Sequence, residues 1–404
     1  MSTFQLLSKL KKKLFFKKKQ KYMLKENYDI NEIKDIINTC NVNFLIGSGL
    51  STPYMETLGK IESLLSEVNE INQDISKKVI LYSLYRKYFL KAISKNPNIL
   101  KEESDCKLVL NNYVQFIKVL NTILSKRKST IINKQVNLFT TNIDVFLEKA
   151  LDTSKVEYND GFSGKLNPIF DINNFKKTSF KTSLFFDNSS EIPTFNLLKL
   201  HGSVTWESKE SNEIYYTSTM EFLKKLEEIH TRITDECFCD VLDDDSIDNL
   251  IKKVAGKIET GNTKEFLCEY DKLLIVNPTD EKFKLVSLNR TYYGLLRQFS
   301  NELEKPNTVL FASGFSFADK HIQEYTLGAA NSNPTLRVYI FAYSTYDGET
   351  IKSNIQFDKV KNNNIKIITP ATDKNSNDAY KFNFVKLLEL FNEISLLIDK
   401  KKTF

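Results

Sequence analysis

Four short apolar runs form the strongest pattern in this sequence, and each run ends in small or polar residues. Their length and apolar content are typical of parallel strands that are buried on both faces of a sheet. Because ligands bind outside the carboxyl ends of the strands in open α/β sheets, we expect the four ends to form one shared site. The runs and their polar ends are residues 42–46 with 47–51, 138–139 with 140–144, 197–200 with 201–203, and 309–312 with 313–317.

The remaining pattern predicts helices inserted between the strands. Helical spacing of apolar residues occurs in about 57–130 and again in about 219–265. Residues 160–195 are rich in Asn, Ser, Asp and Lys, which predicts a long loop. The predicted fold class is therefore α/β, with a Rossmann-like parallel sheet and helical insertions. Further strands are predicted at 272–276, 309–312, 337–342 and 365–368, and a closing helix at 384–397.

Length and cysteine usage narrow the class of protein. With 404 residues the chain is long for one domain and short for three, and we expect a basic N-terminal arm over 1–22 and one domain over 23–404. The 5 cysteines are odd in number and irregular in spacing, and no signal peptide is visible. A reducing, cytoplasmic compartment is the simplest interpretation.

The net charge of +6 comes from the N-terminal arm. Eight lysines between residues 9 and 21 contribute +8, which leaves −2 on the rest of the chain and predicts no nucleic-acid face there. The arm also carries Leu10, Leu14 and Phe15. It is therefore either an amphipathic helix for an acidic lipid surface, nucleic acid or a partner protein, or a solvated arm without a partner. It is too short and too charged for a membrane span or a secretion signal.

The glycine-containing segment at 47–51 carries the first candidate chemistry. It follows an apolar run and precedes helical spacing. Strand, glycine turn and helix is the layout of a phosphate cradle, in which bare backbone approaches a pyrophosphate and a helix N-terminus faces its charge. A plain tight turn is the alternative for this segment alone. The polar ends of the other three runs favour the cradle.

Together these motifs resemble the sirtuins. The segment 47–51 is similar to their G-A-G-x-S loop, with Ser48 in place of Ala, and 140–144 fits T-x-N-x-D. His201 and Gly202 are similar to the catalytic His-Gly of that family, and 314–316 is similar to its G-T-S segment. The order of the motifs along the chain also agrees. The resemblance implies a sheet of the sirtuin type and NAD as the substrate.

The resemblance is closer to a bacterial branch than to the protein deacylases. Residues 158–162, 199–206 and 314–322 are similar to the sirtuin-like NAD hydrolases of antiphage defence. The matching motifs span about 42–345. The implied reaction breaks the bond between ribose and nicotinamide through an oxocarbenium-like state, so the site must hold the sugar and place a nucleophile.

Two residues are the candidates for catalysis. Asn142 suits the placement of the nucleophile because its amide both donates and accepts hydrogen bonds. His201 suits proton transfer from a ribose hydroxyl or water near neutral pH, although without its motif it would be interpreted as structural. Asp144 is expected to orient the nicotinamide or the loop. The residues implied to bind the cofactor are Gly47, Ser48, Gly49, Ser51, Thr140, Asp144, Gly314 and Ser316.

Several of these polar residues have structural alternatives. Asn142 and Asp144 are favoured N-caps for the helix predicted to follow them. His321 with Asp319 is interpreted as a capping or supporting feature, with a catalytic role as the alternative. His230 lies in a helical insertion and is interpreted as a surface residue.

The sequence lacks two features of the deacylase sirtuins. Their zinc ribbon uses two Cys-x-x-Cys pairs, whereas only Cys237, Cys239 and Cys268 follow His201. Three thiols at that spacing do not make a four-ligand ribbon, so we predict no bound metal. Residues 52–59 contain no Arg, where the deacylases carry G-I-P-D-F-R. Both differences favour hydrolysis of NAD by water over transfer to an acyl-lysine peptide.

The residues indicate an NAD site, and the resemblance implies an NAD glycohydrolase that acts as an effector of bacterial antiphage defence by depleting NAD. One alternative is an NAD-dependent protein deacylase or ADP-ribosyltransferase. Another is a catalytically silent NAD-binding subunit of an assembly. We expect no sensor domain in this chain. By resemblance to related effectors we expect a homo-oligomer and a HerA-type ATPase partner.

Overall fold

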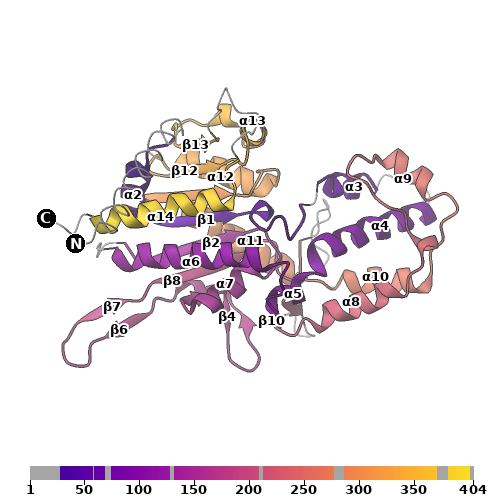
Figure 1. Cartoon of the computed structure of the whole chain (residues 1–404), viewed down its shortest axis with the longest axis horizontal. Helices are drawn as coiled ribbons and strands as arrows, with labels where there is room; N and C mark the ends of the chain where they lie inside the picture. Colours follow the sequence, from indigo (N-terminus) through magenta and orange to yellow (C-terminus); the bar gives the residue numbers. More distant parts are fainter. Residues whose placement is uncertain are drawn as a thin grey trace, which may run out of the picture.

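The computed structural model describes residues 28–57, 59–68, 74–127, 132–208, 213–276, 286–370 and 381–400. The basic arm predicted over 1–22 lies outside these residues. A seven-stranded parallel sheet forms the centre, helices cover both of its faces, and a group of helices extends to one side (Figure 1). The predicted α/β class with its parallel sheet is therefore confirmed. None of the helices in the described part of the chain has the length and apolar character that a membrane crossing requires.

The sheet has the order β13-β12-β11-β1-β2-β8-β3, and all neighbouring strands run parallel. After β1 the chain builds one half of the sheet through β2, β3 and β8, and it then crosses to the other side of β1 to add β11, β12 and β13. The strand order reverses between β1 and β11, which is where ligands bind in sheets of this kind. The strands are β1 (Asn41–Ile46), β2 (Gln135–Thr140), β3 (Glu157–Asn159), β8 (Thr194–Lys199), β11 (Thr308–Ser313), β12 (Arg337–Phe341) and β13 (Ile365–Ile368).

A row of three asparagines crosses the centre of this apolar sheet. Asn43, Asn137 and Asn196 are register partners on β1, β2 and β8. The Asn137 amide nitrogen donates to the Asn43 side-chain oxygen at 2.8 Å, and the Asn196 amide nitrogen donates to the Asn137 oxygen at 2.8 Å. Because Asn43 and Asn196 are buried, a slip of one strand would leave their polar groups without these partners. The row therefore favours one register.

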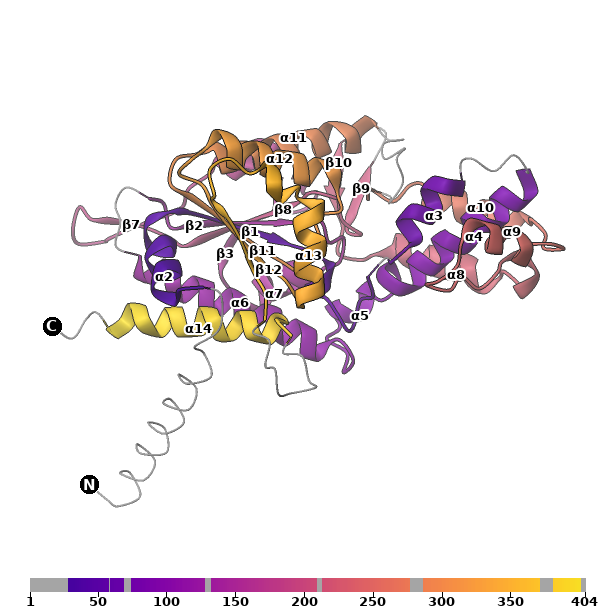
Figure 2. The ribbon, with the colours of Figure 1, turned by 90° about the horizontal axis from the view of Figure 1, so that it is seen from above.

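Helices form a layer on each face of the sheet (Figure 2). One layer holds α2, α6, α7 and α14, and the other holds α11 and α12. The sequence grouped residues 107–126 with the first insertion, whereas these residues form α6, whose Phe116 packs edge-on against Phe44 of β1 with ring centroids 5.1 Å apart. Helical spacing does not reveal which surface a helix covers. The bounds are α2 (Ile30–Thr39), α6 (Lys107–Lys126), α7 (Phe146–Ser154), α11 (Val286–Glu304), α12 (Lys320–Ser332), α13 (Thr345–Asn354) and α14 (Phe384–Lys400).

The group of helices beside the sheet comes from two segments that are distant in sequence (Figure 1). Helices α3 and α4 precede β2, whereas α8, α9 and α10 follow β8. Tyr85 of α4 stacks on Tyr270 of α10 with ring centroids 4.6 Å apart, which joins the two segments. The bounds are α3 (Ile61–Val68), α4 (Asp74–Tyr88), η2 (Phe89–Ile93), α5 (Asn96–Leu100), α8 (Glu221–Thr231), η4 (Asp235–Cys237), α9 (Ile247–Lys253) and α10 (Gly261–Tyr270).

The segment predicted as a long loop over 160–195 instead contains short strands. A small antiparallel sheet has the order β4-β5-β10-β9, and β6 pairs with β7 in a hairpin. The ring of Trp206 packs against Phe162 and Phe170, and this aromatic contact stabilises strands that the polar composition did not predict. The bounds are β4 (Phe162–Ser163), β5 (Ile169–Phe170), η3 (Ile172–Lys176), β6 (Phe180–Thr182), β7 (Ser189–Glu191), β9 (Trp206–Ser208), β10 (Ile214–Tyr216) and η5 (Phe357–Lys359).

The strand predicted at 272–276 is wrong. Its apolar residues, Leu273 to Val276, are buried, but only Ile275 pairs, in an isolated antiparallel bridge with Gly202. Apolar content predicts burial, and it does not supply a neighbouring strand with free hydrogen-bonding groups. The segment lies against the turn after β8.

Candidate active site

Two glycine loops meet at the switch point of the sheet. Gly47 follows β1 and Gly314 follows β11, and a Cβ added to Gly47 would lie 2.2 Å from the Gly314 carbonyl oxygen. The Gly47 amide donates to the Ser313 carbonyl at 3.0 Å, and the Gly49 amide donates to the Gly314 carbonyl at 3.0 Å. Gly314 has φ of +67°, which favours glycine. The glycines are therefore required for the two backbones to pack against each other.

The predicted helix does not start at this loop. A three-residue 3₁₀ turn, η1 (Ser48–Leu50), follows Gly47, and α3 begins only at Ile61. The strand–turn–helix cradle is therefore wrong in its helical part. The apolar spacing in 58–68 correctly indicated a helix, but that helix belongs to the group beside the sheet.

A cavity of about 530 Å³ opens beside the two loops. Its volume is within the range of small-molecule sites. It is lined by Gly49 and by Ser313 to Ser316, so three of the predicted cofactor-binding residues, Gly49, Gly314 and Ser316, border it. The sequence analysis missed further polar lining residues. They include Asn112 of α6, Tyr343 after β12, and Asp347 of α13.

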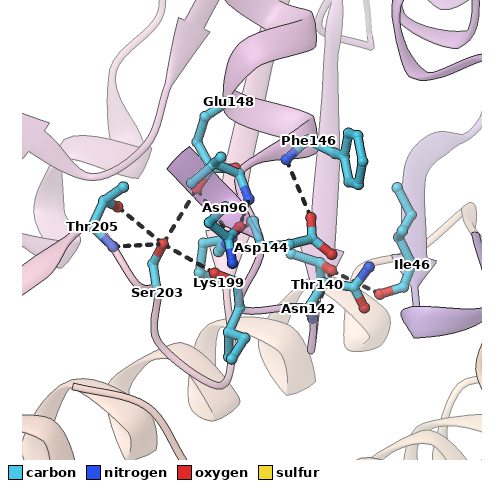
Figure 3. Close-up of polar contacts among 12 residues, drawn as sticks. Ile46, Asn96, Thr140, Asn142, Asp144, Phe146, Glu148, Lys199, Ser203 and Thr205 are labelled. Atoms are coloured by element: carbon cyan, nitrogen blue, oxygen red, sulfur yellow. Dashed lines mark hydrogen bonds and ion pairs between the residues drawn. The ribbon is translucent and has the colours of Figure 1, made fainter. Parts of the chain in front are cut away.

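A buried hydrogen-bond network lies beside the first glycine loop, and Figure 3 shows two of its members, Asn142 and Asp144. The Ser51 hydroxyl donates to the Asp144 carboxylate at 2.8 Å and lies 3.0 Å from the Tyr113 hydroxyl. The Asn142 amide nitrogen donates to Ser51 Oγ and to the Gly47 carbonyl, at 3.2 Å each. The structure thus brings Gly47, Ser51, Asn142 and Asp144 together, as the sequence predicted, and adds Tyr113 from α6.

Asn142 has one polar atom that remains without a partner. Only 6% of the residue is exposed, and its Oδ1 makes no hydrogen bond within the described residues. Its amide nitrogen is held by two acceptors, which fixes the direction of the free oxygen. Buried oxygens are nearly always satisfied, so an orphaned one suggests a partner that the described residues do not supply. Asn142 does not cap α7, whereas Asp144 accepts a hydrogen bond from the Phe146 amide at 3.2 Å.

A buried ion pair supports the same strand ends. Lys199 Nζ lies 3.0 Å from Glu148 Oε1, and the two side chains are 4% and 9% exposed. The Lys199 ammonium also donates to the Asp144 carbonyl (Figure 3). Burial raises the pKa of both Asp144 and Glu148, and the nearby charge of Lys199 opposes that rise. The sequence analysis missed this pair, although a lysine inside a buried apolar run was a visible signal.

His201 follows β8 in a turn that requires glycine at the next position. Gly202 has φ of +75°, and a Cβ there would lie 2.0 Å from the Leu274 carbonyl oxygen. The His201 carbonyl accepts from the Val276 amide at 2.9 Å. His201 Nε2 lies 3.1 Å from Asp319 Oδ2. Asp319 caps α12, so the predicted capping role is correct, and its contact with His201 was missed.

The register of the sheet places the two candidate catalytic residues at matching positions. Thr140 of β2 pairs with Lys199 of β8, and Asn142 and His201 each follow two residues later. The Thr140 hydroxyl supports this arrangement, because it donates to the Ile46 carbonyl at 2.8 Å and accepts from the Asn142 amide at 3.0 Å. Ser48 is exposed at the start of η1.

The structure also shows the surroundings of His230 and of the cysteines that follow His201. His230 was interpreted as a surface residue, but it is half-buried, and its Nδ1 lies 3.3 Å from the Tyr82 hydroxyl. Cys237 and Cys239 are buried and Cys268 is exposed. Among the described residues, no group of three His, Cys, Asp or Glu side chains has the arrangement to hold a metal ion.

Comparison with known proteins identifies a family whose model matches this chain. The model of the SIR2-like domain matches residues 136–368. A search of curated proteins found no match. A solved structure described as a Sir2 mutant with p53 peptide and NAD covers 92% of this chain and 100% of its own chain, at 14% identity and a TM-score of 0.37. That overlay is too loose for residues to be transferred between the two structures.

Proposed function

Since this chain belongs to the SIR2-like domain family, we propose that it hydrolyses NAD to nicotinamide and ADP-ribose. The family implies NAD-dependent chemistry. The observation that supports our choice of site is the free, buried Oδ1 of Asn142 beside the two glycine loops. An unpartnered acceptor there fits a ribose hydroxyl or a water molecule, both of which donate hydrogen bonds.

The residues around the switch point fit the parts of NAD. Gly49 and Gly314, which are half-buried, and the exposed Ser316 border the cavity of about 530 Å³, and we assign the phosphates and a ribose of NAD to this cavity. The Gly47 carbonyl and Ser51 Oγ accept hydrogen bonds from the Asn142 amide nitrogen, and Asp144 in turn accepts from Ser51, so the amide needs no rearrangement to act. Such a fixed dipole is more effective than a mobile one in stabilising a developing charge.

The proposed mechanism assigns one task to each of two side chains. Asn142 accepts a hydrogen bond through Oδ1 and so places the donor, a water molecule or a ribose hydroxyl. His201 accepts the proton that is released when water replaces nicotinamide on the ribose carbon. The balance is NAD⁺ plus water to nicotinamide, ADP-ribose and a proton. A positioned base of this kind contributes about a hundredfold or more to the rate.

Two features of the chain favour hydrolysis over deacylation. The chain after His201 has three cysteines, two of them buried, and Cys237 Sγ lies 3.7 Å from the hydroxyls of both Thr234 and Thr260. Residues 52–59 lack the arginine of the deacylase loop. Both observations weaken the deacylase and ADP-ribosyltransferase alternatives.

The biological role that we propose is that of an antiphage effector that depletes NAD. It rests on the similarity of residues 158–162, 199–206 and 314–322 to such effectors. Uncontrolled hydrolysis of NAD would kill the host cell, so control by assembly is expected. We propose a homo-oligomer that is controlled by a HerA-type ATPase partner, with the helices beside the sheet and the basic arm over 1–22 as contact surfaces.

A product assay separates the alternatives. The purified protein is incubated with NAD, with and without an acetyl-lysine peptide, and nicotinamide, ADP-ribose and O-acetyl-ADP-ribose are resolved by chromatography. The proposal predicts equal amounts of nicotinamide and ADP-ribose in both reactions. An acetylated product that appears only with peptide would support the deacylase, and NAD binding without any product would support the silent subunit.

A further inference from the structure

Asp319 and His201 are in contact although they lie far apart in the sequence. His201 Nε2 is 3.1 Å from Asp319 Oδ2, and the two side chains are 18% and 8% exposed. An ionised carboxylate only accepts hydrogen bonds, so the imidazole nitrogen that faces it carries the hydrogen. Within the described residues, the other ring nitrogen, Nδ1, has no hydrogen-bond partner.

The carboxylate of Asp319 is fixed by the helix that it caps. Its Oδ1 accepts from the His321 amide at 2.9 Å and from the Ile322 amide at 3.2 Å, at the N-terminus of the 13-residue helix α12. One oxygen is therefore held by the cap, and this leaves the other, Oδ2, directed at His201. The N-terminus of a helix also favours the negative charge.

We propose that Asp319 is a positioning residue for His201. It holds the imidazole in the tautomer with hydrogen on Nε2, which leaves the Nδ1 lone pair to take the proton released by hydrolysis. This inference rests on the proposed function of His201 as a base. A carboxylate that orients a histidine and stabilises its protonated form is a recurrent arrangement in acid–base catalysis.

In the described part of the chain, Asp319 is the residue that forms an ion pair with His201. Tyr292 of α11 faces the imidazole with ring centroids 6.2 Å apart. Burial raises the pKa of Tyr292, and the charge of Asp319 adds to the rise, so this phenol stays neutral near pH 7. The ring centroids of His321 and Tyr292 are 6.3 Å apart. The Val276 amide donates to the His201 carbonyl, which anchors the backbone that carries the imidazole ring.

The variant Asp319→Asn separates the two roles of Asp319, because it keeps the N-cap of α12 and changes only the group that faces His201. Asparagine is as good an N-cap as aspartate, and its oxygen is expected to stay on the His321 and Ile322 amides. Its NH₂ group then replaces Oδ2 and donates to Nε2, which forces the hydrogen of His201 onto Nδ1. Asp319→Ser keeps a cap but is too short to reach His201. Asp29→Asn is the matched control, because Asp29 caps α2 through the Asn31 amide at 2.9 Å, away from this contact.

Tautomers are read by two-bond ¹H–¹⁵N spectra of protein labelled in its 3 histidines, without NAD. Wild-type protein is expected to show His201 with hydrogen on Nε2, and Asp319→Asn with hydrogen on Nδ1. In NAD hydrolysis, Asp319→Asn is expected to lower kcat on the order of a hundredfold with KM unchanged.

The outcomes separate this inference from the proposed function. If the wild type does not hydrolyse NAD, the proposed function fails, and the tautomer spectra still decide whether Asp319 sets the state of His201. If the wild type hydrolyses NAD but Asp319→Asn keeps the wild-type rate or the wild-type Nε2–H tautomer, the positioning role is wrong. Asp29→Asn should match the wild type in both measurements.

Discussion

Gly47 and Gly314 pack backbone against backbone at the point where the strand order of the sheet reverses. A methyl group on Gly47 would lie 2.2 Å from the Gly314 carbonyl oxygen. No flexible side chain is available to move away, so the loops themselves must separate. This contact explains why glycine is needed here without reference to any ligand, and it also fixes the loops that border the cavity.

The variant Gly47→Ala is expected to lower the free energy of unfolding by about 1–3 kcal/mol, the usual range for overpacking. Binding of NAD should weaken with it, because the loops that border the cavity shift. Urea unfolding and calorimetric titration with NAD measure the two effects. Gly328→Ala is the control, since Gly328 is an exposed residue of α12 with open space around it and should gain up to about 1 kcal/mol. Wild-type stability of Gly47→Ala would contradict the packing of the two loops.

The buried pair of Lys199 and Glu148 predicts a distinctive pH dependence. Burial raises the pKa of Glu148 above its ordinary value of 4.5, so the folded protein holds this proton more tightly than the unfolded chain does. The contribution of Glu148 to stability is therefore greatest below pH 4.5 and is lost as the pH rises toward the folded pKa. The stability of the wild type relative to Glu148→Gln should fall over this window, as measured by urea unfolding at several pH values.

The control for this titration has the opposite sign. A hydrogen bond from Lys149 lowers the pKa of Glu102, so that carboxylate contributes stability above its ordinary pKa of 4.5 and loses it as the pH falls. The stability of the wild type relative to Glu102→Gln should therefore rise slightly with pH. Asp144 also has a raised pKa, but it is present in both proteins of each comparison and cancels. Equal slopes for the two variants would argue against the burial of Glu148.

The asparagine row across the sheet gives a third prediction. Asn137→Val leaves the Asn43 oxygen and an amide hydrogen of Asn196 without their partner, and should lower the free energy of unfolding by about 1–3 kcal/mol. Replacing all three asparagines by valine removes the unpaired groups as well. The triple variant should therefore be less destabilised than the sum of the three single variants, as measured by urea unfolding. Strict additivity would show that the three side chains act independently.

The zinc content of the purified protein is a fourth test. Burial raises the pKa of Cys239, which disfavours the thiolate that zinc requires. Cys239 is buried whereas Cys268 is exposed. Elemental analysis is expected to find no stoichiometric zinc, and a chelator should leave the unfolding temperature unchanged. A full equivalent of tightly held zinc would bring the deacylase alternative back.

The sequence predicted those parts of the candidate site that directly follow the buried strands. Apolar runs identified β1, β2, β8 and β11. The parallel register of β2 and β8 then brings Asn142 and His201 to matching positions just after these neighbouring strands. This succeeded because strands of such a sheet share one direction, so polar residues that follow them collect at one edge.

The sequence was less informative where a contact depends on how helices pack. Tyr113 reaches Ser51 from α6, and Asp319 reaches His201 from the start of α12. Neither pairing has a local signal, because the partners are separated by 62 and 118 residues respectively. The strand expected at 272–276 failed for a related reason: burial is encoded locally, whereas a hydrogen-bonding neighbour is not.

The most direct test of the central claim is the rate of nicotinamide release from NAD by three proteins, namely the wild type, Asn142→Ala and His201→Ala, assayed alone and with the proposed ATPase partner. Circular dichroism and the unfolding temperature verify that the variants stay folded. We predict release by the wild type and a loss on the order of a hundredfold or more in each variant, because each removes a positioned group. Wild-type turnover by His201→Ala, or a wild type that releases no nicotinamide in either condition, would contradict the account.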